Sequence, residues 1–155
     1  MNDGIQVLDP LFLLISAEAC WQCRAPQTVI AIGAHRLIGE YGEVGDSRGL
    51  ILLSNITAMP AHVWEYIRAR NPRYVLRQSR TAESTYYANT CECGALIGDF
   101  YLFSEPGGAF FPLSPNEAAG IKYHRMPFDG PFAFECSYSQ GPGDAILAHG
   151  INESA

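Results

Sequence analysis

Residues 11–34 read LFLLISAEACWQCRAPQTVIAIGA and place a cysteine pair between two apolar runs. The run Leu11–Ser16 predicts a buried strand or a short helix that opens the fold. Thr28–Ala34 is rich in β-branched side chains and predicts a strand. Between these runs, Cys20 and Cys23 have C-x-x-C spacing, which is common in metal knuckles. The segment therefore contains both a strand of the expected sheet and the first of two cysteine pairs that could bind a metal.

A second cysteine pair lies far along the chain. Cys91 and Cys93 form a C-x-C pair followed directly by Gly94, and 67 residues separate Cys23 from Cys91. Two close pairs suit one tetrahedral cation, because each pair needs only a short loop and the metal then joins two knuckles. Thiolate ligands favour zinc or an iron–sulfur centre over magnesium or calcium. The spacing predicts a structural zinc bound by Cys20, Cys23, Cys91 and Cys93.

Three other interpretations of the cysteines remain open at this point. The thiols could be buried without a ligand, form a disulfide, or form a redox C-x-x-C pair. The lack of an export signal argues against the disulfide, and the lack of a helix signature after the C-x-x-C argues against the redox pair. Four thiolates on one zinc leave no open coordination position, so such a zinc would stabilise the fold rather than activate water. Cys136 is expected to be a buried strand residue.

Composition restricts the class of protein. The chain has 155 residues, of which 48% are hydrophobic and 17% charged. These values exclude a disordered chain, a collagen and a coiled coil, and they predict a single domain over residues 1–155. The formal net charge of -6 argues against a surface that binds phosphate backbones over its whole extent. The stretch 68–80 nevertheless lacks acidic residues and carries an arginine strip: Arg68, Arg70, Arg73, Arg77 and Arg80.

The remaining pattern predicts an α+β fold with a mainly antiparallel sheet and one or two helices. Pro60 and the spacing of Val63, Tyr66 and Ile67 predict a helix that ends before Asn71-Pro72. Further strands are expected at 50–55, 74–80, 84–89, 95–103 (the longest) and 132–139, with a long loop over 39–49, an ordered loop layer over 104–131 and a frayed tail from 141.

Several short motifs follow one another in order: C-W-Q-C at 20–23, Y-Y-A-N-T-C-E-C-G at 86–94, G-D-F at 98–100 and P-G-G-A-F-F-P at 106–112. Together they resemble a family of small bacterial zinc-ribbon-like domains. The resemblance covers about residues 18–112 and leaves 113–155 as a loop-rich C-terminal extension. It implies knuckles that join two chain segments and a zinc held by the four cysteines named above. The second knuckle of that family is C-x-x-C, so the shorter C-E-C here leaves open whether Cys93 is a ligand.

Side chains near the knuckles also carry expectations. Trp21, Tyr86, Tyr87 and Phe100 are expected to form the core around the metal-binding ends. Asp99 is expected to stabilise a turn by accepting N–H groups of its neighbours, or to support a metal ligand.

No catalytic motif accompanies the cysteines, so we expect a non-catalytic, zinc-stabilised binding protein in the cytoplasm, with a protein partner and no membrane partner. The concrete hypothesis is an immunity-type inhibitor that neutralises a basic bacterial toxin through an acidic surface. The alternative is a nucleic-acid-associated zinc module that uses the arginine strip, with Tyr66 and Tyr74 for stacking. A metal-dependent enzyme is the third hypothesis. The acidic candidates for partner binding are Glu40, Glu43, Asp46, Glu105, Glu117 and Asp129.

Overall fold

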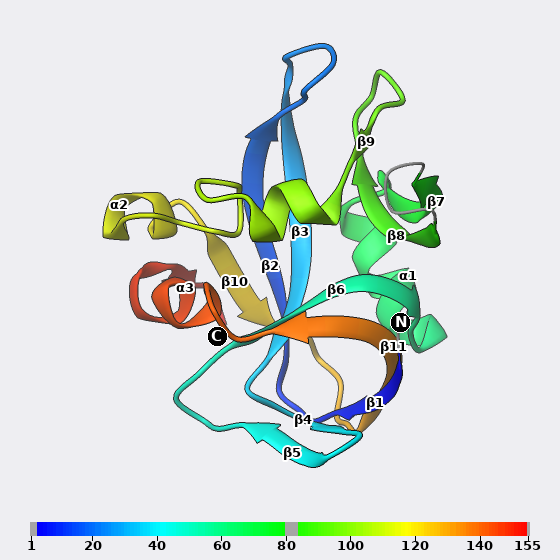
Figure 1. The fold of residues 1–155 in the computed structure, drawn as a ribbon, viewed down its shortest axis with the longest axis vertical. Helices are drawn as coiled ribbons and strands as arrows, with labels where there is room; N and C mark the ends of the chain where they lie inside the picture. Colours follow the sequence, from blue (N-terminus) through cyan, green and yellow to red (C-terminus); the bar gives the residue numbers. More distant parts are fainter. Residues whose placement is uncertain (1–2, 80–83, 155) are drawn as a thin grey trace.

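A computed structural model of the chain describes residues 3–79 and 84–154. These residues form a large sheet of nine strands in the order β12-β10-β2-β3-β6-β11-β1-β4-β5 and a small sheet in the order β7-β8-β9. Neighbouring strands are antiparallel except for β10 and β12, which confirms a mixed α and β fold with a mainly antiparallel sheet. The large sheet curls round on itself (Figure 1).

The strands of the large sheet are β1 (Asp3–Val7), β2 (Leu11–Ala19), β3 (Pro26–Ala34), β4 (Arg36–Gly39), β5 (Gly42–Gly45), β6 (Ile51–Ala58), β10 (Lys122–Arg125), β11 (Phe132–Ser139) and β12 (Ile151–Asn152). The small sheet contains β7 (Tyr74–Ser79), β8 (Ser84–Thr90) and β9 (Leu96–Ile97). The described part of the chain has four helices, more than the one or two expected: α1 (Ala61–Arg70), the π-helix η1 (Phe100–Ser104), α2 (Pro115–Ala118) and α3 (Gly143–His149).

The β2–β3 hairpin is the longest ribbon in the fold, because all nine residues of β2 pair with β3. Leu11 and Leu13 point into one hydrophobic cluster, whereas Phe12 and Leu14 point into a second cluster on the opposite face. Burial on both faces explains why these strands are continuous apolar runs instead of alternating apolar and polar residues. Leu11–Ser16 is therefore strand, and the suggestion of a short helix is wrong.

Three segments differ from the expected pattern. The segment 95–103 is not the longest strand: β9 ends at Ile97, and Phe100–Ser104 forms the π-helix. Tertiary contacts override its β-propensity, since Leu102 is fully buried and its C=O accepts the Phe110 N–H at 3.0 Å. The expected loop over 39–49 contains the β4–β5 hairpin. The expected frayed tail from 141 contains α3, whose Ile146 is fully buried.

Residues 113–155 also differ from the expected loop-rich extension. β10 from this segment pairs with β2, and β11 lies between β6 and β1 near the middle of the large sheet. Phe132 and Phe134 of β11 are buried in the first hydrophobic cluster. The segment is therefore part of the sheet and of the core.

The small sheet is joined to the large sheet through a gap beside β3. β6 pairs with β3 only at Ile32, Gly33 and Ala34, so the earlier residues of β3 need another partner on that edge. The buried side chain of Asn89 on β8 supplies it: Oδ1 accepts the Ile30 N–H at 2.8 Å and Nδ2 donates to the Ile30 C=O at 3.0 Å. This pair of bonds replaces a rung of the sheet.

No helix among residues 3–79 and 84–154 is both long and apolar enough to cross a membrane.

The two hydrogen bonds of the Asn89 side chain predict a large loss of stability when this side chain is removed. Asn89→Ala leaves the buried N–H and C=O of Ile30 unpaired, and we expect the free energy of unfolding to fall by about 2 to 4 kcal/mol. Urea denaturation followed by fluorescence measures this change. Gln78→Ala, at an exposed position of β7, is the control and should change stability by less than about 0.5 kcal/mol. Equal effects of the two substitutions would contradict the role assigned to Asn89.

Candidate metal centre

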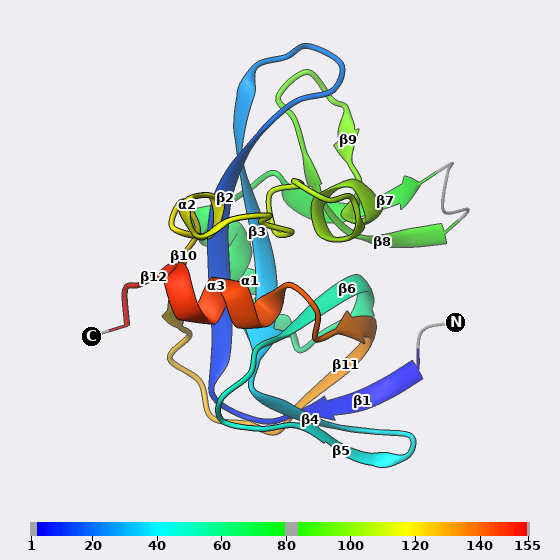
Figure 2. The same ribbon diagram turned by 60° about the vertical axis from the view of Figure 1, so that its left-hand side comes forward.

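Two hairpin tips form the centre. Cys20 and Cys23 lie in the turn between β2 and β3, and Cys91 and Cys93 lie in the turn between β8 and β9. Figure 1 shows both tips at the top of the molecule, and Figure 2 shows them side by side from a second direction. Residues that are far apart in the sequence therefore meet at one end of the fold.

The four sulfur atoms lie within 4.8 Å of one another, an arrangement that could hold a metal ion. The two short contacts cross between the hairpins: Cys20 Sγ is 3.7 Å from Cys93 Sγ, and Cys23 Sγ is 3.5 Å from Cys91 Sγ. All five cysteines of the chain are free thiols, so the structure does not contain the disulfide that was left open as an alternative. Cys93 lies with the other three despite the shortened C-E-C spacing.

The two knuckles share one backbone pattern although they differ by one residue in length. The N–H of the first cysteine donates to the C=O two residues beyond the second cysteine, from Cys20 to Ala25 and from Cys91 to Ala95. The residue after the second cysteine has positive φ, at Arg24 (66°) and Gly94 (94°). Gly94 adopts that conformation without steric cost, whereas Arg24 does not have this advantage.

Backbone amides act on the sulfur atoms from within each knuckle. The Gln22 N–H lies 3.4 Å from Cys20 Sγ, and the Cys93 N–H lies 3.5 Å from Cys91 Sγ. The pKa of Cys20 is lowered to about 6, chiefly by the Cys23 N–H. Burial opposes this shift, and the Gln22 N–H adds to it. The pKa of Cys91 is raised to about 12: the Cys93 N–H favours its thiolate, but burial and the surrounding thiols outweigh that contribution. The first cysteines of the two knuckles are therefore shifted in opposite directions, and the thiolate is favoured at Cys20.

Side chains hold the two tips together. Trp21 Nε1 donates to the Leu96 C=O at 2.7 Å, which links the first knuckle to β9. The indole is 57% exposed and Phe100 is 70% exposed, so the expectation that both belong to the core is wrong. Tyr86 is buried, as expected. Arg77 Nη2 donates to the Gly94 C=O at 3.2 Å and positions a cation beside the second knuckle.

Asp99 has a different role from the one expected. Its Oδ2 accepts the Asn55 N–H of β6 at 2.7 Å, a contact 44 residues away in the chain, and its own N–H donates to Tyr86 Oη at 3.2 Å. Asp99 thus ties the start of η1 to the large sheet instead of capping its own turn. Burial raises the pKa of Asp99 to about 7, although the Asn55 N–H opposes this shift.

The acidic candidates do not form one surface. Glu40, Glu43 and Asp46 lie on and just after the β4–β5 hairpin, at the opposite end of the molecule from the knuckles (Figure 1). Glu105 follows η1 and Glu117 lies in α2. Glu117 Oε1 accepts the Leu113 N–H at 3.1 Å, and Asp46 Oδ1 accepts the Arg48 N–H at 2.8 Å.

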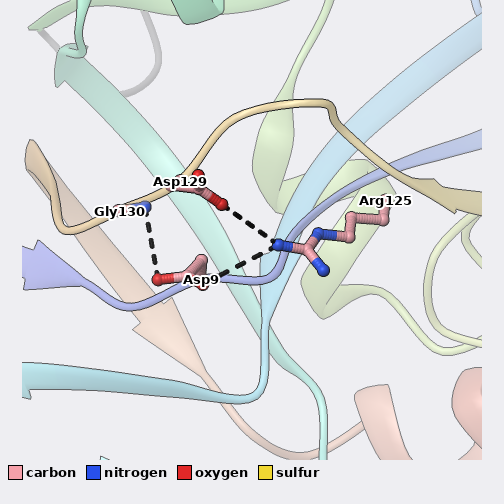
Figure 3. A network of polar contacts seen from close by, with 4 residues as sticks. All are labelled: Asp9, Arg125, Asp129 and Gly130. Carbon is pink, nitrogen blue, oxygen red and sulfur yellow. Dashed lines mark hydrogen bonds and ion pairs between the residues drawn. The ribbon is translucent and has the colours of Figure 1, made fainter.

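Asp129, the sixth acidic candidate, forms an ion pair with a neighbouring arginine. Arg125 Nη2 lies 3.4 Å from Asp129 Oδ1 and 3.8 Å from Asp9 Oδ2 (Figure 3). Asp9 Oδ1 also accepts the Gly130 N–H at 3.2 Å. The network ties the β1–β2 connection to the end of β10 and the loop before β11, which is a structural role.

Tyr41, which was not predicted as a site residue from the sequence, lies between Glu40 and Glu43. Gly39 pairs with Gly42, so Glu40 and Tyr41 form the two-residue connection of the β4–β5 hairpin. Tyr41 is 97% exposed. An exposed aromatic side chain beside two carboxylates is the kind of anchor that protein interfaces use, and the Gly-rich stretch was the signal for a turn at this position.

The arginine strip is largely engaged within the protein. The guanidinium of Arg68 lies 4.7 Å from the Trp64 ring centre, and that of Arg70 lies 3.6 Å from the Tyr66 ring centre. Arg73 Nη2 lies 3.7 Å from Glu92 Oε1. Arg80 falls outside the described residues. Tyr74 is buried and stacks on Tyr87, so its expected role in base stacking is not possible.

No protein-family model, curated protein or solved structure matches the chain.

The buried carboxyl group of Asp99 predicts a pH-dependent stability. Its pKa is about 7 in the folded protein and about 3.9 in an unfolded chain, so between these values the folded state holds a proton that the unfolded state lacks. Stability should fall as pH rises from about 4 to 7, by on the order of 4 kcal/mol at most. Asp99→Asn should remove this slope and be the more stable protein at pH 8.

Urea denaturation of wild type and Asp99→Asn at pH 5 and pH 8 measures the difference. Glu40→Gln, at an exposed position in the β4–β5 turn, serves as the control and should keep the wild-type slope. Parallel pH profiles for wild type and Asp99→Asn would contradict the assignment.

Proposed function

We propose that the chain is a zinc-stabilised, non-catalytic binding protein. The observation that carries the proposal is the position of the four sulfur atoms, all within 4.8 Å of one another and with cross-hairpin contacts of 3.5 and 3.7 Å. A tetrahedral zinc with Zn–S bonds of about 2.3 Å requires sulfur atoms about 3.8 Å apart. The spacing thus suits a single ion at the centre of the four thiolates.

The donor set favours zinc over other cations. Four sulfur ligands exclude magnesium and calcium, which require oxygen ligands. A spacing of at most 4.8 Å suits one ion and leaves too little room for an iron–sulfur cluster, whose sulfide ions hold the cysteines further apart. Four thiolates also fill the tetrahedron and leave no position for water, which supports a stabilising zinc over a metal-dependent enzyme.

The acidic tip of the β4–β5 hairpin, defined by Glu40, Tyr41 and Glu43, is the proposed partner surface. Among the described residues, neither Glu40 nor Glu43 takes part in an ion pair. Two free carboxylates attract a cationic partner and increase its association rate, and the exposed ring of Tyr41 provides apolar contact area. A small acidic protein with such a tip suits an immunity-type inhibitor of a basic bacterial toxin in the cytoplasm.

The contacts of the arginine strip favour this function over the nucleic-acid alternative. Phosphate binding would require Arg68 and Arg70 to leave the rings of Trp64 and Tyr66, and Arg73 to leave Glu92. Each change costs part of an existing interaction. A titration of labelled single-stranded DNA at low ionic strength is therefore expected to show no binding.

The zinc proposal predicts a defined stoichiometry. Protein purified in reducing buffer should contain one zinc per chain by inductively coupled plasma mass spectrometry. Cys93→Ser should lose most of the metal, because serine replaces a thiolate with a hydroxyl group. Cys136→Ser, which changes a buried thiol in β11, should keep one zinc per chain. A wild-type protein that contains no zinc after purification and does not take it up on titration would refute the proposal.

The partner surface predicts a charge-dependent interaction. A partner identified by co-purification at low salt should bind Glu40→Lys/Glu43→Lys at least about tenfold more weakly than wild type, since the acidic tip becomes basic. Glu65→Lys/Glu105→Lys introduces the same charge change at two exposed positions elsewhere and is the matched control. Isothermal titration calorimetry at two salt concentrations measures both variants. Equal weakening by the two variants would show that net charge, and not this tip, decides binding.

A further inference from the structure

We propose that the four cysteines are also a site of oxidative modification, in which a hydroperoxide converts the cross-hairpin pairs Cys20–Cys93 and Cys23–Cys91 into two disulfides and releases the metal. The inference rests on the proposed zinc function for the release step. The pairing itself rests only on the arrangement of the cysteines.

The pairing follows from distance. The short sulfur contacts of 3.7 and 3.5 Å both join one hairpin to the other. Each requires only a modest movement to reach the bonding distance of about 2.05 Å. Both pairs can form together, because they share no cysteine.

Solvent access differs within each pair and gives the two sulfur atoms different roles. Cys93 and Cys23 are exposed, whereas their partners Cys20 and Cys91 are buried. A peroxide therefore reaches one sulfur of each pair first and converts it to a sulfenic acid. The buried sulfur lies 3.7 Å (Cys20) or 3.5 Å (Cys91) from the modified sulfur, which it then attacks to form the disulfide.

The reaction balances with two equivalents of hydrogen peroxide. In each pair the exposed thiolate attacks a peroxide oxygen and releases hydroxide, and the buried thiolate then attacks the sulfenic sulfur and releases a second hydroxide. Over both pairs, four thiolates lose four electrons and form two S–S bonds. The peroxides accept these electrons, four protons turn the hydroxides into water, and the zinc leaves as Zn2+.

The products would hold the same two hairpins together as the metal does. The pairs span 73 and 68 residues of sequence, so each disulfide closes a long loop and restricts the unfolded chain strongly. The oxidised protein should therefore keep the tips together without metal. The reduced protein without metal lacks both constraints.

Cys136 provides an internal reference in every measurement. It lies in β11, is 3% exposed, and does not belong to the cluster of four sulfur atoms. A buried thiol outside the cluster lacks both the solvent access that peroxide needs and the neighbouring sulfur that forms a disulfide. Oxidation should therefore consume four of the five thiols.

The direct test treats the zinc-loaded and the metal-free protein with hydrogen peroxide and maps the disulfides by mass spectrometry. Chymotrypsin cleaves after Trp21 and separates Cys20 from Cys23, and a glutamate-specific protease cleaves after Glu92 and separates Cys91 from Cys93. We expect Cys20–Cys93 and Cys23–Cys91 linkages, one remaining thiol per denatured chain, and release of one zinc for two peroxides consumed. Linkages within a knuckle, or oxidation that stops at sulfinic acid, would overturn the pairing.

Two double variants with the same number of cysteines test the roles of exposure and distance. Cys23→Ser/Cys91→Ser keeps the exposed and buried members of one pair and should form the Cys20–Cys93 disulfide. Cys23→Ser/Cys93→Ser keeps only the buried Cys20 and Cys91 and should lose thiols at least about tenfold more slowly. Equal rates would overturn the proposed order of attack. The wild-type disulfide map does not depend on how well either variant folds.

The outcomes separate this inference from the zinc proposal. A protein that binds no zinc but forms the two cross-hairpin disulfides overturns the zinc proposal and supports the pairing. A protein that binds one zinc but forms other disulfides retains the zinc proposal and overturns the pairing.

Discussion

The two hydrogen bonds between the Asn89 side chain and the backbone of Ile30 are the constraint on which the rest of the structure depends. β3 pairs with β2 along its whole length but with β6 only at its last three residues. Unpaired backbone N–H and C=O groups on the remaining edge of β3 would be costly inside the protein. A single amide side chain pairs with both backbone groups and attaches the small sheet at one register. Because β8 leads directly into the second knuckle, this attachment also determines where Cys91 and Cys93 lie.

The cluster of four cysteines follows from that attachment. The β2–β3 ribbon carries the first knuckle to the end of the molecule, and the β8–β9 turn meets it there. Two further hydrogen bonds join the large sheet and its hairpin to the small sheet and η1: Trp21 Nε1 donates to the Leu96 C=O, and the Asn55 N–H donates to Asp99. The sulfur atoms are therefore brought together by protein contacts, and a metal ion or a pair of disulfides would stabilise an arrangement that the fold already favours.

Much of the local structure could be predicted from the sequence. The strand at Thr28–Ala34 and the helix after Pro60 lie within β3 and α1, because apolar run length and helix boundaries are local signals. The strand expected over 95–103 failed, since buried Leu102 and the distant contact of Asp99 with Asn55 favour a helical turn there. Likewise, Trp21 and Phe100 are large apolar residues of a type that is usually buried, but their positions in the fold leave them exposed.

The sequence by itself determined that four cysteines occur in two close pairs and that acidic residues occur within the Gly-rich stretch 39–49, because residue type and spacing are covalent properties of the chain. Only the tertiary structure decided which sulfur atoms lie close to each other, that Cys93 belongs to the cluster, and that Glu40 and Glu43 flank an exposed Tyr41. These relations depend on contacts across dozens of residues, such as the bonds from Asn89 to Ile30. Such contacts form only when burial and backbone hydrogen bonding are satisfied for the whole fold at once.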